Sequence, residues 1–170
     1  GAVGGRVYDS SHRLCYGAKV LGLHGMVGDV FQGLKAGHSG YLHKVILQQN
    51  YHAVSGKAMM VKRELFLKAG GFSEDVEDRM KDVDLCLKVR KNGSLIVYEP
   101  YVQLYHMESK TRGAEDSEAK VRRFQEEIEY MRCQWIDILR KGDPYYNKNL
   151  SLTKWNYSLR PIRGMENKEK

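Results

Sequence analysis

The sequence has few cysteines and prolines, and it has no long apolar run. Three cysteines and three prolines occur among its 170 residues. Cys15, Cys86 and Cys133 are far apart and odd in number, which argues against a disulfide framework or a CxxC zinc knuckle. No stretch approaches the ~18 consecutive apolar residues that span a bilayer. These features favour a reducing, cytoplasmic location, with peripheral contact at the inner face of the membrane as an open alternative.

Excess positive charge is present, but it is not concentrated. Lys and Arg total 28 against 21 Asp and Glu, a formal net charge of +7. The basic residues are spread along the chain beside acidic ones, and no RNP signature, zinc finger or helix-turn-helix spacing is found. We therefore predict no nucleic-acid partner. A solvated basic surface that faces anionic lipid headgroups or phosphorylated substrates is the preferred interpretation.

Local patterns predict alternating strands and helices. Residues 1–11 and 18–23 are typical of strands, 25–51 of a long glycine-rich loop, 53–61 of a buried strand, and 62–69 of a short helix. Gly70 and Gly71 are expected to end that helix in a left-handed conformation. Two strand-like runs follow, on either side of Pro100. This order predicts an α/β domain with a mixed sheet.

A long amphipathic helix is the clearest element. Apolar residues recur at spacings of three and four at Val121, Phe124, Ile128, Met131, Trp135 and Ile138. Gly142 and Pro144 should end this helix. We interpret the stripe as packing surface that carries no chemistry.

Two acidic residues stand where a charged loop becomes an apolar helical pattern. Residues 79–93, "RMKDVDLCLKVRKNG", contain Asp82 and Asp84. A helix N-cap would explain Asp82, because its carboxylate can accept backbone N–H groups, but it leaves Asp84 unexplained. A metal-binding DxD needs a buried strand before it. The preceding "SEDVEDRMK" is polar, so the context argues against that motif.

Three motifs in order resemble the second half of family 2 glycosyltransferases of the GT-A fold. They are "AVSGKAMMVKRELFLKAGGF", "KDVDLCLKVRKNG" and "LIVYEPYVQLYHMES". The resemblance covers nearly the whole chain, and "DPYYNKNLSL" is similar to bacterial members that build cell-surface polysaccharides. It implies a GT-A-like acceptor-side half in residues 1–113, a packing helix in 114–142 and a C-terminal tail in 143–170.

The same resemblance implies roles for individual residues. Asp82 matches the catalytic base, and Asp84 matches a second acid that helps to hold the acceptor or the loop. Ser55 and Gly56 match a small pair that lines the sugar pocket. His106, in "LYHMES", matches a histidine that contacts the metal or the donor diphosphate.

The function implied is sugar transfer with inversion, from a nucleotide-sugar donor to a glycan or lipid-linked acceptor. A divalent Mn or Mg ion is expected in the complete enzyme. The opening "GAVGGRVY" lacks a starting Met, and no donor-side DxD is seen, so we expect the chain to be part of a longer protein. Alone, it is expected to bind no metal and to be inactive. A non-catalytic carbohydrate- or phosphate-binding module is the alternative.

Overall fold

A mixed five-stranded sheet forms the centre of the molecule. The structure, a computed structural model, describes residues 1–76, 79–107 and 118–161. The strands of this sheet are β1 (Ala2–Tyr8), β2 (Leu14–Tyr16), β5 (Gln49–Tyr51), β7 (Met59–Val61) and β8 (Ile96–Tyr105). β1 pairs in parallel with β8 and antiparallel with β2 and β7, and β5 pairs antiparallel with β8 on its other side.

A small antiparallel sheet packs closely against β1. Its strand order is β4 (Val27–Asp29), β3 (Ala18–Leu21) and β6 (Ala53–Val54). A Cβ atom built on Gly4 of β1 would lie 2.4 Å from Val54 Cβ, a distance that no side chain could occupy. The glycine in β1 therefore allows the second sheet to approach the first, which brings the end of β6 into the interior.

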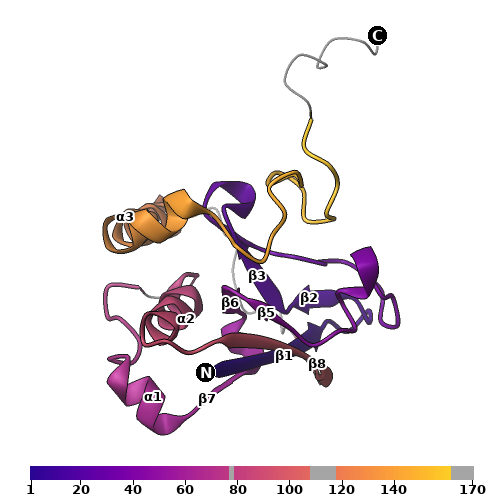
Figure 1. Cartoon of the computed structure of the whole chain (residues 1–170), viewed down its shortest axis with the longest axis horizontal. Coiled ribbons are helices and arrows are strands. Elements are labelled where there is room, and N and C mark those ends of the chain that lie inside the picture. Colours follow the sequence, from indigo (N-terminus) through magenta and orange to yellow (C-terminus); the bar gives the residue numbers. More distant parts are fainter. Residues whose placement is uncertain (77–78, 108–117, 162–170) are drawn as a thin grey trace.

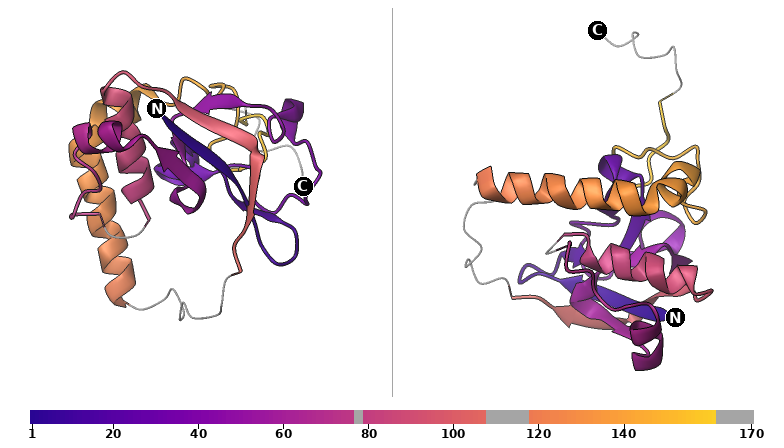
Figure 2. Two further views of the ribbon diagram at one scale, coloured as in Figure 1. Left: turned by 90° about the horizontal axis from the view of Figure 1, so that it is seen from below. Right: turned by 90° about the vertical axis from the view of Figure 1, so that its left-hand side faces the viewer.

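Three α-helices cover one side of the strands. They are α1 (Arg63–Lys68), α2 (Lys81–Lys91) and α3 (Glu118–Lys141), and short 3₁₀ turns occur at η1 (Leu23–Gly25), η2 (Tyr41–His43) and η3 (Gly56–Ala58). α2 lies between the strands and α3 (Figures 1 and 2). Its apolar side chains are buried, since both of its long faces are covered. No helix in the described ranges has the length and apolar character to cross a membrane.

The fold confirms an α/β domain with a mixed sheet and a long C-terminal helix. Gly70 and Gly71 adopt φ of 81° and 66°, as expected where α1 ends. The long loop predicted for 25–51 is wrong, because β4, η2 and β5 lie within it. The single strand predicted for 53–61 is also wrong. The chain leaves the small sheet at Ser55, turns through η3 and joins the large sheet as β7.

Two further expectations concern the second half of the chain. β8 continues through Pro100, although its register with β1 shifts there, so that Gly4 pairs with Tyr98 and Arg6 with Gln103. Arg6 Nε donates to the Pro100 carbonyl at 2.7 Å across this irregularity. The expected boundary between 113 and 114 lies outside the described residues.

The segment after α3 is part of the same core. Tyr146, Leu150 and Tyr157 are buried with the strands and helices. The Tyr157 ring stacks between Phe31 and Tyr41, with ring centroids 5.1 and 5.2 Å away. Burial of several large side chains makes this segment a contributor to stability.

Candidate functional site

A cavity of about 640 Å³ opens where the small sheet, η3, the start of α2 and α3 meet. Such a volume lies within the usual range for small-molecule sites, roughly 300–1,000 Å³. The cavity is lined by Tyr16, Lys19, Val27, Asp29, Gln32, Ser55, Gly56, Lys57, Phe72, Arg79, Met80, Lys81, Asp82 and Phe124. Three of the five residues predicted for the site are thus brought together here, namely Asp82, Ser55 and Gly56.

Asp82 lies in the first turn of α2 and faces the cavity. The N-cap position belongs to Met80 and no side chain caps this helix, so the interpretation of Asp82 as an N-cap is wrong. Asp82 Oδ2 instead accepts the backbone N–H of Gly56 at 2.9 Å, and Oδ1 accepts that of Val83 at 2.8 Å. These two hydrogen bonds orient the carboxylate. The Asp82 side chain remains 14% exposed, so a ligand can still reach it.

The Ser55–Gly56 pair has a geometric reason to be small. Ser55 Oγ accepts the Lys57 N–H at 3.3 Å and so begins the η3 turn, which aims the Gly56 amide at Asp82. A Cβ atom on Gly56 would lie 3.1 Å from Asp82 Cβ, which is tighter than ordinary van der Waals contact. Glycine therefore lets the backbone donor reach the carboxylate.

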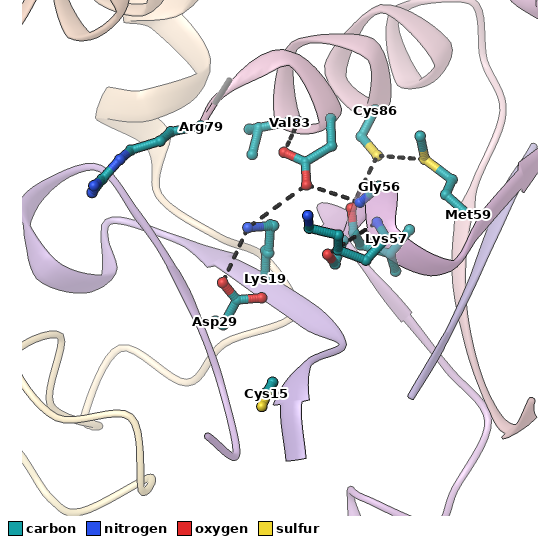
Figure 3. A network of polar contacts seen from close by, with 12 residues as sticks. Cys15, Lys19, Asp29, Gly56, Lys57, Met59, Arg79, Val83 and Cys86 are labelled. Carbon is teal, nitrogen blue, oxygen red and sulfur yellow. Dashed lines mark hydrogen bonds and ion pairs between the residues drawn. The ribbon is translucent and has the colours of Figure 1, made fainter. Parts of the chain in front are cut away.

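A lysine and a second aspartate, which the sequence patterns did not single out, complete this polar network. Lys19 Nζ, from β3, lies 3.1 Å from Asp29 Oδ2 of β4 and 3.7 Å from Asp82 Oδ2. In Figure 3 the Lys19 ammonium lies between Asp29 and the first turn of α2. Burial disfavours the ammonium, but the charges of Asp29 and Asp82 outweigh burial and raise the pKa of Lys19. Lys19 is therefore a single cation that is shared by two carboxylates.

Asp84 lies in the protein core. It is fully buried, and it does not line the cavity wall. Its Oδ2 accepts the Ser73 hydroxyl at 2.7 Å and lies 2.9 Å from Lys88 Nζ, while Oδ1 accepts the Trp135 indole N–H at 2.8 Å. Of the two roles implied for this acid, the contacts favour holding the loop after α1 over touching the acceptor. Trp135, interpreted as packing alone, also serves as a hydrogen-bond donor.

His106 follows β8 at some remove from Asp82. Its backbone N–H donates to the Tyr8 carbonyl at 2.8 Å, and its ring packs edge-to-face on Tyr16, with centroids 6.2 Å apart. Tyr16 lines the cavity, whereas His106 does not. Among the described residues no group of three or more His, Cys, Asp or Glu side chains is arranged to hold a metal ion. The described residues around His106 therefore include no such ligand group.

The chain is similar to parts of two longer proteins. Over 162 residues the chain is 38% identical to the uncharacterized protein y4gI of Sinorhizobium fredii (strain NBRC 101917 / NGR234), a match that covers 94% of this chain and 18% of that protein. Over 161 residues it is 30% identical to the O-antigen biosynthesis protein RfbC of Myxococcus xanthus, covering 94% of this chain and 12% of that protein. No family model and no solved structure matches. The chain thus spans less than a fifth of either relative, and it is similar along nearly its whole length to part of an O-antigen biosynthesis protein.

Proposed function

We propose that this chain is the acceptor-side part of an inverting glycosyltransferase, which moves a sugar from a nucleotide-sugar to a glycan or lipid-linked acceptor. The observation that carries the proposal is the carboxylate of Asp82, held at the cavity wall by the Gly56 amide. The similarity to an O-antigen biosynthesis protein supports the same class of reaction, because a polysaccharide is assembled by transferring sugars.

Asp82 is suited to act as the general base. Each oxygen of the Asp82 carboxylate accepts one backbone N–H group. Because a carboxylate oxygen can accept two hydrogen bonds, each keeps one acceptor position for a substrate hydroxyl. The acceptor oxygen attacks the anomeric carbon of the donor sugar while its proton passes to Asp82. The bond from the anomeric carbon to the diphosphate oxygen breaks, and its electron pair leaves with the nucleoside diphosphate. Attack opposite to the leaving group inverts the anomeric centre.

A divalent metal is not assigned a step in this scheme. His106 offers a single imidazole, and the described residues provide no further ligand cluster around it. A metal of the complete enzyme would need its other ligands from the donor diphosphate and from residues outside the described ranges. The residues that act in the proposal are Asp82 as base, and Gly56 and Lys19 as the groups that orient and neutralise it.

The first prediction tests Asp82 in the complete enzyme. Asp82→Asn keeps an acceptor for the Gly56 N–H but removes the proton acceptor, so the transfer rate should fall by about 10²–10⁴-fold. The free energy of unfolding should fall by less than ~1 kcal/mol, because the Lys19 contact is long at 3.7 Å and Lys19 keeps its nearer partner, Asp29. Transfer assays and thermal unfolding measure the two quantities.

The matched control is Asp75→Asn, the same change at an exposed carboxylate outside this cavity. It should leave both quantities near wild type. Wild-type turnover by Asp82→Asn would refute the catalytic assignment. Sugar binding without any transfer by the complete wild-type protein would instead identify a non-catalytic carbohydrate-binding module.

A further inference from the structure

We propose that the sugar bound in this cavity is anionic, carrying a carboxylate or phosphate group that Lys57 and Lys81 bind beside Asp82. This inference rests on the proposed function, because it names the class of acceptor for the same site. It is carried by the charges around the cavity and by the aromatic side chains in its wall.

The charges on the cavity wall do not balance. Lysine and arginine contribute four cations to the lining, and aspartate contributes two anions, a formal excess of two positive charges. Lys19 is already occupied by both carboxylates. In the part of the chain that the structure describes, Lys57 and Lys81 form no ion pair of their own. Among the described residues these two ammonium groups have no counter-ion, and a ligand anion would supply one.

The two lysines lie on the elements that hold the base. Lys57 follows Gly56 in η3, as Figure 3 shows, and Lys81 precedes Asp82 in the first turn of α2. α2 has eleven residues, and its start carries no side-chain cap although Met80, Lys81 and Asp82 line the cavity. The partial positive charge at a helix N-terminus favours a negative group near it. The first turn of α2 already contains Asp82 and Asp84, so the two lysines, rather than the helix end, supply the positive charge for a ligand.

Aromatic side chains give the cavity the character of a sugar site. Tyr16, Phe72 and Phe124 lie in its wall. Lys57 Nζ lies 5.8 Å from the centre of the Tyr16 ring, and the Arg79 guanidinium lies 4.9 Å from that of Phe124. Apolar ring faces suit the C–H face of a sugar, and the cations beside them suit an acidic substituent on the same ring. Pyrophosphate is also an anion, but it has no sugar ring for the aromatic side chains to contact.

Binding by the 170-residue chain can separate these sources of negative charge. Amide NMR spectra of the isotope-labelled chain would be followed during titration with glucuronate, glucose-6-phosphate, glucose and pyrophosphate. We expect the two acidic sugars to shift the amides of Gly56, Lys57, Lys81 and Asp82. Their affinity should exceed that of glucose by about a hundredfold, because each of the two lysines provides a charge-assisted hydrogen bond that contributes about tenfold. Added salt should weaken the acidic sugars and leave glucose unchanged.

Charge-removing variants complete the test. Lys57→Gln and Lys81→Gln should each weaken the acidic sugars by about tenfold and leave glucose unchanged. Lys148→Gln makes the same charge change at an exposed position outside the cavity, and it should have no effect. Equal affinity for glucose and glucuronate, binding of pyrophosphate alone, or no binding of any probe at millimolar concentration would each overturn the proposal.

The proposed function and this inference can fail separately. Asp82→Asn should still bind the acidic sugars, since both lysines remain. If that variant keeps its transfer activity, the catalytic proposal is wrong while acidic-sugar binding stands. If transfer is lost but glucose binds as well as glucuronate, the base is correct and the acceptor is neutral.

Discussion

At the scale of single residues, Asp82 and Asp84 show how two identical side chains two positions apart acquire different environments. Successive helix residues are rotated by about 100°, so these two point in nearly opposite directions from the axis of α2. Asp82 faces the cavity, whereas Asp84 faces the core between α2 and α3. The helix geometry thus separates a carboxylate that a ligand can reach from one that is enclosed by Ser73, Lys88 and Trp135.

The second residue to test is Gly56, whose lack of a side chain sets the position of Asp82. In Gly56→Ala the new Cβ would lie 3.1 Å from Asp82 Cβ, so the carboxylate must shift by a few tenths of an ångström. A misplacement of about 1 Å can cost roughly 10²-fold in rate, so we expect a loss of about tenfold. Stability should change by less than ~1 kcal/mol, because Gly56 has no positive φ that alanine would strain.

Transfer rates and melting temperatures of the complete enzyme measure these effects. Asp82→Asn combined with Gly56→Ala provides the control for mechanism. If Gly56 acts through Asp82, the double variant should be about as slow as Asp82→Asn alone. Independent, multiplied losses would show that Gly56 contributes in another way.

At the scale of elements, α3 does more than cover α2. Its axis departs from helical geometry at Trp135, where φ is −125° and ψ is 16°. From this position the indole N–H reaches Asp84 at 2.8 Å, and Arg79 N–H, in the segment before α2, donates to Glu127 of α3 at 3.2 Å. These bonds fix α3 to α2 and to the segment that forms one wall of the cavity.

The third prediction concerns this attachment. Trp135→Phe keeps most of the apolar ring but leaves a buried carboxylate oxygen without its donor, so the free energy of unfolding should fall by about 2 kcal/mol. For a chain of this size that corresponds to a melting temperature lower by roughly 4–8 °C. Trp155→Phe, at a partly buried tryptophan, should lower it by less. Equal losses in the two variants would show that ring volume, and not the bond to Asp84, is what stabilises α3.

Sequence patterns predicted the elements that local signals determine, and they failed where pairing between distant segments decides. The paired glycines ended α1, and the apolar stripe identified α3, because both signals lie within a few residues. The change of sheet after Val54 could not be predicted, since it depends on Gly4 of β1 admitting β6. Lys19 and Asp29 were missed for the same reason, because only the pairing of β3 with β4 places them beside Asp82.

At the scale of the whole molecule, three buried tyrosines link folding to alkaline pH. The Tyr51 and Tyr157 hydroxyls lie 3.0 Å apart, and the Tyr98 hydroxyl donates to the Val45 carbonyl at 2.9 Å. Burial raises the pKa of all three phenols above the ordinary value of 10.0. The Tyr51–Tyr157 contact joins β5 to the segment after α3, and the Tyr98 bond joins β8 to the stretch before β5, so the protonation state of these phenols bears on packing between distant segments.

The direction of the pH effect follows from these raised pKa values. Below about pH 10 the phenols are protonated in both the folded and the unfolded chain, and they contribute no pH dependence. Above it the unfolded chain releases protons that the folded chain keeps, so the free energy of unfolding falls as pH rises. Each tyrosine contributes up to about 1.4 kcal/mol per pH unit, and the three together about 4 kcal/mol.

Urea unfolding measured between about pH 8 and 11 tests this fourth prediction. The stability should be level at first and then fall steeply, and tyrosinate absorbance should rise with unfolding. Tyr98→Phe should reduce the slope, whereas Tyr101→Phe, at a side chain that is 83% exposed, should leave it unchanged. A slope that is the same in all three proteins would contradict the assignment to buried phenols.

The use of a main-chain amide to orient Asp82 has a consequence for divergence among related proteins. The backbone of residue 56 supplies an amide N–H whatever side chains surround it. The bond to Asp82 requires a small residue at position 56 only, and it places no such requirement on positions 57, 79 and 81, which also line the cavity. If the proposed function is correct, substitutions at those three positions should alter the ligand that the cavity selects without removing the bond that holds the carboxylate. A combinatorial library confined to them would therefore explore new acceptor preferences on an unchanged reaction centre.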